Sequence, residues 1–373
     1  MSSVYCIAGE ASGDFLGAKL LKALKEKEPN LHFAGVGGLL MRAEGLTSLF
    51  PMEEISLMGI AEIIPHIPNV MKRINQTVQD ILTVQPKVLV TIDSTGFCFR
   101  VVKKLQRLGI FIPVVHYVAP SVWAWRPKRA KRLVGLVDHL LTLFPFEPPY
   151  FTKYGLQTTF VGHPLVEDQF DKKIKKDPNA ILLLPGSRLG EVKRHWPIFL
   201  KTAQILKKEN PSLSFYTPTF PHLLPLLKGQ VPENFPVHFS LDSSEKWTLF
   251  QKASVALAAS GTVSLELAKA STPMVVAYRV NQFTYQLLKR IIYTPYVSLV
   301  NILLNKPVVP ELLQEHCTAG ELAHHMGQII KNPSDQKKDL EKAVQLLKSG
   351  EDIPSHVAAN VVLSYVKNSE KTN

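Results

Sequence analysis

Short apolar runs alternate with longer amphipathic stretches along most of this 373-residue chain. Apolar runs of this kind are typical of parallel strands that are buried on both faces, and the stretches between them of crossover helices. In the first half, strands are predicted at 4–9, 32–37, 88–93, 112–118 and 139–144, with helices at 17–28 and 99–109 among the segments between them. In the second half, strands are predicted at 180–186, 213–219, 237–241, 255–260 and 273–279. The pattern predicts an α/β protein with two Rossmann-like, doubly wound sheets.

The length of the chain favours two domains of ordinary size. The polar and charged stretch 166–179 ends in a turn signal and is the best linker candidate. We therefore predict a first domain at 1–170, a second domain at 171–345 and a C-terminal helix and tail at 346–373. The last fifty residues have helical patterns, and the C-terminal helix is expected to pack on the first domain or on a partner copy.

The composition is that of a globular protein, with 46% hydrophobic and 20% charged residues. Lys and Arg exceed Asp and Glu by 43 − 31 = 12, which implies attraction to nucleic acid, phospholipid headgroups or a phosphorylated substrate. The basic residues form no recognised nucleic-acid motif, so no nucleic-acid partner is expected. The three cysteines form no CxxC pair and indicate reduced thiols. Without a signal-peptide pattern or an apolar run of bilayer length, a cytoplasmic protein is expected, and surface attachment stays open.

Ligands of open α/β sheets bind beyond the carboxyl ends of the strands, so a cleft between two facing sheets would collect loops from both. The first strand runs into "AGEASGDFLGA" (8–18), whose glycines do not match the dinucleotide spacing G-x-G-x-x-G. Glu10 in this loop can hydrogen-bond to a sugar hydroxyl, whereas Ser12 or Asp14 can simply cap the helix. Asp93 ends the strand 88–93. It is either a helix cap or a general base that reaches a substrate proton.

Two turns in the second half are candidates for phosphate binding. In "LLLPGSRLGEVKRHWP" (182–197), Ser187 and Arg188 stand where a helix should begin. The unpaired N–H groups and the dipole of a helix N-terminus, together with the two-pronged donor of an Arg guanidinium, can bind a diphosphate without a metal ion. The segment "AASGTVSLELAKASTPMVVAYR" (258–279) repeats the arrangement, with the turn Ser260, Gly261 and Thr262 followed by Glu266. A purely structural turn is the alternative for each.

No His, Asp or Glu cluster has metal-ligand spacing, and His116 and His163 stand alone in apolar surroundings, so neither a metal nor another cofactor is expected. Asn301, Glu311 and Gln314 are polar residues set among apolar ones, and each by itself is also explained as a surface or capping group.

The stretch 59–78 places apolar residues near helical spacing, with Lys72 and Arg73 beside them. One reading is a core-facing helix. The other is docking on the cytoplasmic leaflet through Ile63, Ile64, Ile67 and Met71, with the basic residues meeting anionic headgroups.

The stretch "VAPSVWAWRPKRAKRL" (118–133) follows a strand of the first half, and a helix is expected to begin at Arg126. Its tryptophans indicate a cleft wall, with simple packing as the alternative. We predict that Ser12, Met58, Trp123 and Arg126 line the acceptor side of the cleft. The basic cluster is expected to face an acceptor phosphate, the membrane surface or only solvent.

Taken together, these motifs resemble the lipid-A-disaccharide synthase family, inverting glycosyltransferases of the two-sheet B-type fold. The resemblance covers nearly the whole chain. It runs in order through "AGEASGD", "MEEISLMGIAEI", "TIDSTGF", "HYVAPSVWAWRPKRAKR", "LFPFEPPYF", "FVGHPL", "LLPGSR", "ASGTVSLE", "PMVVAYR" and "YVSLVNILLNKPVVPELLQE". It implies transfer of diacylglucosamine from UDP-2,3-diacylglucosamine to the 6-hydroxyl of 2,3-diacylglucosamine 1-phosphate (lipid X), giving a β-1,6-linked disaccharide 1-phosphate and UDP. Another UDP-sugar glycosyltransferase or an epimerase of the same fold is the alternative.

The resemblance also implies roles for individual residues. The catalytic Asp of the family falls on Asp93, with Glu10 as the early Glu. The UDP and phosphate site falls on Ser187, Arg188, Ser260, Gly261, Thr262, Glu266, Asn301, Glu311 and Gln314. Thr95 and Gly96 stand where the family usually has a Pro and often a second Asp, so Asp93 is expected to act alone or with Glu10. The cytoplasmic face of the inner membrane is the expected partner surface, and members of the family can be homodimers.

Overall fold

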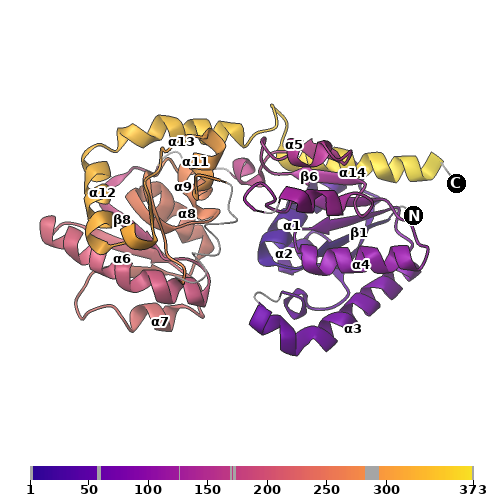
Figure 1. Cartoon of the computed structure of the whole chain (residues 1–373), viewed down its shortest axis with the longest axis horizontal. Helices are drawn as coiled ribbons and strands as arrows, with labels where there is room; N and C mark the ends of the chain where they lie inside the picture. The colour runs from indigo at the N-terminus through magenta and orange to yellow at the C-terminus, as the bar shows by residue number, and fades with distance from the viewer. Residues whose placement is uncertain are drawn as a thin grey trace. The chain divides into compact units, whose positions relative to one another are not determined.

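The computed structural model describes residues 3–56, 60–125, 127–168, 170, 174–281 and 294–371, without the side chains of 60–66, 243 and 369–371. The chain divides into two compact units. The first unit is made of Met1–Glu167 together with Leu347–Asn373, and the second is Asp168–Leu346. Figure 1 shows the last helix, in yellow, within the unit that holds the N-terminal strand. The first unit is therefore built from both ends of the chain.

A seven-stranded parallel sheet forms the centre of the first unit, in the order β3-β2-β1-β4-β5-β6-β7. Its strands are β1 (Ser3–Ala8), β2 (His32–Val36), β3 (Thr47–Ser48), β4 (Val88–Ile92), β5 (Val114–Tyr117), β6 (His139–Thr142) and β7 (Gln157–Phe160). The chain runs from β1 outward to β3 and then returns to the other side of β1, where β4 begins the second half of the sheet. The strand order therefore reverses between β1 and β4.

Helices cover both faces of this sheet. They are α1 (Ala11–Lys27), α2 (Leu39–Ala43), α3 (Ile60–Val84), α4 (Thr95–Arg107), α5 (Pro149–Thr152) and α14 (Pro354–Lys371), with 3₁₀ turns η1 (Met52–Glu54), η2 (Pro127–Leu133) and η3 (Pro164–Glu167). The buried residues of α1 include Leu16, Leu20 and Leu24, one helical turn apart, and α14 packs on α1. Tyr5 and Ile7 of β1 belong instead to the core cluster that α3 and α4 complete.

The second unit holds a six-stranded parallel sheet in the order β10-β9-β8-β11-β12-β13. The strands are β8 (Asp177–Leu184), β9 (Ser214–Pro218), β10 (Val237–Ser240), β11 (Ala253–Ala259), β12 (Met274–Tyr278) and β13 (Glu311–Leu313). The helical elements are α6 (Leu189–Glu209), α7 (Leu224–Lys228), α8 (Ser243–Lys252), α9 (Val263–Lys269), α11 (Leu299–Leu304), η4 (Gln314–His316), α12 (Ala319–Lys331) and α13 (Ser334–Leu346). Here the strand order reverses between β8 and β11.

The predicted α/β fold with two parallel sheets and a helical C-terminus is confirmed. The sequence pattern missed β3, β7 and β13, which are two to four residues long and lie at sheet edges, so they carry no apolar run. The helix expected from Arg126 was wrong in type, because Pro127–Leu133 forms a 3₁₀ helix. Gly135 follows with a φ of 80°, which stops a longer helix. Among the described residues, no helix is long and apolar enough to cross a membrane.

Candidate functional site

The carboxyl ends of β1 and β4 flank the point where the strand order of the first sheet reverses, which is where open α/β sheets bind ligands. The loops that follow these strands meet closely. A Cβ atom on Gly9 would lie 2.3 Å from the Oγ of Ser94, so only a glycine allows this approach. The loop with Glu10 and Ser12 and the loop with Asp93 are thereby brought together.

Asp93 stands directly after β4 in an unusual backbone conformation. Its φ is 51° and that of Ser94 is 36°, so two consecutive non-glycine residues lie in the left-handed region. The backbone N–H of Asp93 donates to the carbonyl of Tyr117, at the end of β5, over 2.9 Å. Helix α4 then begins at Thr95. The sharp turn between strand and helix therefore fixes the position of the Asp93 carboxylate.

Burial raises the pKa of Asp93 above the usual range of an aspartate. The backbone N–H of Ser94 and the side chain of Ser12 hydrogen-bond to the carboxylate and lower its pKa, but burial is the larger effect. A raised pKa makes the ionised carboxylate a stronger base. This half-buried group at the switch point has the properties that proton abstraction requires.

Glu10 is half-buried at the N-cap position of α1, and its carbonyl accepts a hydrogen bond from the N–H of Asp14. Asp14 does not cap its own helix. Its buried carboxylate accepts hydrogen bonds from the N–H groups of Gly38, Leu40 and Met41 and so caps α2. The loop after β1 is thus anchored to the next helical turn by Asp14.

Trp123 is held in place by a buried carboxylate, Glu147, that was not predicted from the sequence. Its Nε1 donates to Glu147 over 3.2 Å, and its ring packs edge-on against Phe146. The other Glu147 oxygen accepts the N–H groups of Leu143 and Phe144, and burial raises the pKa of Glu147 to about 7. A Glu inside the apolar motif "LFPFEPPYF" was the available signal. The contacts of Trp123 are those of a packed wall.

Several predicted residues fall outside the structural description. Met58 and Arg126 are not among the described residues, and Ile63 and Ile64 lie on α3 without described side chains. Ile67 and Met71 are large apolar residues of α3 that are 48% and 47% exposed. Further along the same helix, Ile74 is buried in the core.

The second sheet repeats the arrangement, because β8 and β11 flank its switch point. Ser187 and Arg188 follow β8, and Arg188 is the N-cap residue of α6. Its side chain is 64% exposed, with Glu191 3.8 Å away. Gly261 and Thr262 are exposed in the turn after β11. The switch point of this sheet therefore presents hydrogen-bond donors to solvent.

His195 of α6, which was not predicted from the sequence, joins the turn after β8 to the residue after β12. Its Nδ1 lies 3.0 Å from the carbonyl of Pro185, and its Nε2 accepts the N–H of Arg279 over 3.0 Å. This pattern requires a neutral ring with the proton on Nδ1. Burial lowers the pKa of His195 and favours that form. The turn after β8 and the residue after β12 are fixed to one another.

The polar residues near residue 300 form one network with the turn after β11. Ser260 Oγ donates to the carbonyl of Val297, whose N–H donates to Glu311. Buried Asn301 donates to Val309 and Glu311, and its oxygen accepts the N–H groups of Val308 and Val309. The Asn301 amide has thus used all four of its hydrogen-bonding positions.

The last two predicted residues of this site also have partners within the second unit. Gln314 accepts the N–H of Val280, and Glu266 is ion-paired with Lys246 at 2.8 Å. Three or more His, Cys, Asp or Glu side chains placed to hold a metal ion do not occur in the part of the chain that the structure describes.

A family model described as lipid-A-disaccharide synthetase matches residues 4–363. A lipid-A-disaccharide synthase of Rhodospirillum centenum is 43% identical over 379 residues, which cover 97% of this chain and 94% of the relative. The enzyme of the same name from Gluconobacter oxydans is 42% identical, with 90% and 83% covered. These similarities extend over both units.

Solved structures share the fold at low sequence identity. A co-structure of S. aureus MnaA with UDP has a TM-score of 0.68 at 16% identity, covering 98% of this chain and 97% of that one. MurG of Acinetobacter baumannii has a TM-score of 0.60 at 13% identity, covering 98% and 100%. At such identities the likeness shows the B-type glycosyltransferase fold.

Proposed function

The chain belongs to the lipid-A-disaccharide synthase family of glycosyltransferases, and on that premise we propose how its residues carry out the reaction. The donor is UDP-2,3-diacylglucosamine and the acceptor is lipid X. The acceptor 6-hydroxyl oxygen attacks the anomeric carbon while the bond from that carbon to the UDP oxygen breaks, with inversion. The products are the β-1,6-linked disaccharide 1-phosphate and UDP.

Asp93 is the proposed general base, which takes the proton of the acceptor hydroxyl as the new bond forms. The observation that carries this role is the half-buried carboxylate at the switch point of the first sheet, with its raised pKa and its left-handed turn. Glu10, on the neighbouring loop, is proposed to orient the acceptor sugar. A single carboxylate can take this proton, and Thr95 and Gly96 supply no second acid in the loop.

The second unit is proposed to bind UDP through Ser187, Arg188 and the turn Ser260–Thr262. The N–H groups at the start of α6 and the Arg188 guanidinium can stabilise the charge that develops on the leaving diphosphate. The internal contacts of Asn301, Glu311 and Gln314 support a positioning role for these three residues. They hold the Ser260 turn and the backbone after β12 in the shape that the diphosphate requires.

Helix α3 is proposed to dock on the cytoplasmic face of the inner membrane, from which acylated substrates reach the enzyme. Ile67 and Met71 are exposed although both are large and apolar, and docking would bury them in the headgroup region. Because Ile74 and Val78 are buried, the same helix also contributes to the core. Substitution of both Ile67 and Met71 by Ser should weaken vesicle binding without unfolding the protein. Unchanged vesicle binding would contradict docking through this helix.

The reaction is tested with purified protein, UDP-2,3-diacylglucosamine and lipid X, with UDP release and the disaccharide product measured together. UDP release is expected only when both substrates are present. UDP-N-acetylglucosamine, which lacks the acyl chains, should be a poor donor. Rapid UDP release without lipid X, or epimerisation of the unacylated sugar nucleotide, would contradict the proposed transfer.

A further inference from the structure

A cavity of about 360 Å³ lies in the first unit at the carboxyl ends of β4 and β5. Its lining begins at Thr95 and Gly96, two and three residues after Asp93, and includes Pro120 of the loop after β5. Phe99 and Leu136 supply apolar walls. The cavity therefore adjoins the loop of the proposed base without containing it.

Four basic side chains line this cavity: Arg100, Lys103, Arg129 and Arg132. None of its lining residues is acidic, and in the described part of the chain none of the four cations forms a salt bridge. Arg100 donates to the carbonyl of Gly96 over 2.6 Å, and Arg129 lies over the ring of Trp125 at 5.0 Å. Like charges gathered around one cavity repel one another unless an anion joins them.

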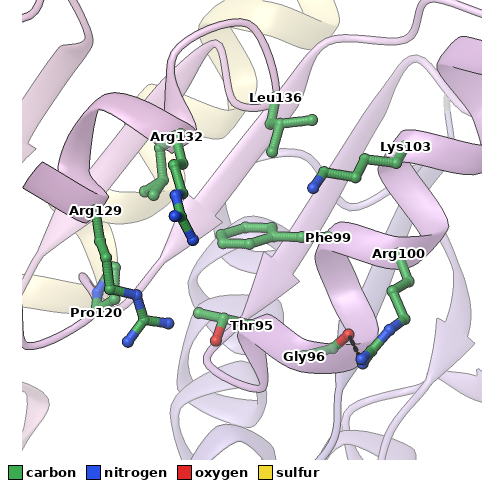
Figure 2. A pocket seen from close by; sticks show the side chains of 10 residues that line it. Thr95, Gly96, Phe99, Arg100, Lys103, Pro120, Arg129, Arg132 and Leu136 are labelled. Atoms are coloured by element: carbon green, nitrogen blue, oxygen red, sulfur yellow. Dashed lines mark hydrogen bonds between the residues drawn. The ribbon is translucent and has the colours of Figure 1, made fainter.

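The local structure explains why the four side chains line one cavity. Arg100 and Lys103 are three residues apart on α4, which places them on one face of that helix. Arg129 and Arg132 are three residues apart on the 3₁₀ helix η2, where three residues make one turn and the two side chains align. Figure 2 shows Arg129 and Arg132 reaching toward Thr95 and Phe99 from one side and Lys103 approaching from the other.

We propose that this cavity binds the phosphate monoester of the acceptor, an inference that rests on the proposed function. A sugar phosphate carries between one and two negative charges at neutral pH, and guanidinium groups bind its oxygens in a fork. The volume of about 360 Å³ exceeds that of a phosphate group and leaves room for part of the sugar beside Phe99 and Leu136. Anchoring the phosphate beside the Asp93 loop would restrict how the acceptor hydroxyl approaches the base.

The test compares two double variants with the same loss of charge on the same two elements. Lys103→Ala with Arg132→Ala removes two cations of the cavity. Arg107→Ala with Lys131→Ala removes two exposed cations that do not line it. Binding of lipid X in neutral detergent micelles is measured without donor. Turnover is then measured with lipid X and with 2,3-diacylglucosamine, which lacks the phosphate.

We expect the cavity variant to raise Kd and KM for lipid X by at least about 10-fold, the effect of losing charge-assisted hydrogen bonds. The KM for the UDP donor should not change. The KM for the dephosphorylated acceptor should be the same in the wild type and the cavity variant. The Arg107/Lys131 variant should match the wild type. The proposal is overturned if the cavity variant loses affinity equally for both acceptors. It is also overturned if the two double variants lose the same affinity for lipid X.

A phospholipid headgroup is the other source of the same phosphate chemistry, and vesicles separate the two. If the cavity variant loses binding to phosphatidylglycerol vesicles but keeps its lipid X affinity in neutral micelles, the cations serve the membrane and the proposal is overturned. If the wild type binds lipid X through the cavity but forms no disaccharide, the proposed function fails while the cavity assignment stands.

Discussion

The two sheets present opposite chemistry at the same topological position. At the switch point of the first sheet, a half-buried carboxylate stands in a left-handed turn, and burial raises its pKa. At that of the second sheet, Ser187 and Arg188 are exposed donors at the start of a long helix. The strand order provides a ligand position in each unit, while local burial decides whether that position suits proton transfer or anion binding.

The polar groups next to the two switch points also differ. In the second unit, buried Asn301 has all its hydrogen bonds within the protein and stabilises the turn beside it. In the first unit, Ser12 is exposed, yet it hydrogen-bonds to the candidate base itself. Substitutions at the switch point of the first sheet should therefore change kcat. Substitutions at the switch point of the second sheet should change stability and UDP affinity.

Asp93→Asn should have the largest effect, because it removes the proposed base while preserving the shape of the side chain. We expect kcat to fall about 10³-fold, within the range that general base catalysis contributes. UDP affinity, measured by calorimetry, should be unchanged because the proposed UDP site lies in the other unit. Asp352→Asn, an exposed aspartate of the first unit, is the matched control. Turnover within a few-fold of the wild type would remove Asp93 from the mechanism.

Asn301→Ala should act on stability. It leaves the N–H groups of Val308 and Val309 without their acceptor and removes one donor to the Glu311 carboxylate. We expect the free energy of unfolding to fall by about 2–4 kcal/mol. Urea unfolding and UDP calorimetry would measure the loss of stability and of affinity. Asn332→Ala, at an exposed position of the same unit, should leave both the free energy of unfolding and the UDP affinity unchanged. A stable Asn301 variant that has lost UDP binding would indicate direct contact with the ligand instead.

Arg188→Ala should weaken UDP binding about 10-fold, since one charge-assisted contact is lost at an exposed position. The raised Kd should appear in UDP calorimetry. The free energy of unfolding should stay the same, because the Arg188 side chain is 64% exposed and its 3.8 Å ion pair with Glu191 is solvated. Lys193→Ala on the same helix removes an equal charge and should leave UDP affinity intact. Equal losses in both variants would indicate a general effect of charge.

The sequence predicted the strands that carry apolar runs, and the rule for open sheets then placed Asp93 and Arg188 at ligand positions. It could not predict the edge strands, which are too short, or the type of helix at Pro127–Leu133. His195 also escaped prediction, because it joins the carbonyl of Pro185 to the N–H of Arg279, which lies 84 residues after His195 itself. The left-handed turn at Asp93 and Ser94 depends on close packing with Gly9, which no local pattern reveals.

Ser12→Ala should have the smallest effect on activity, and this effect should be specific to the switch point of the first sheet. The Ser12 hydrogen bond stabilises the carboxylate and lowers the pKa of Asp93, so its removal should raise that pKa further. At a given acidic pH, fewer molecules would then carry the ionised base.

The acid limb of the pH profile of kcat/KM should consequently move to higher pH, while the plateau above it stays near the wild-type value. Ser121→Ala, in the exposed loop after β5, should leave the profile unchanged. A limb that moved to lower pH would mean that Ser12 does not stabilise the charged form of the base. A lower plateau with an unmoved limb would place Ser12 on the substrate instead of on Asp93.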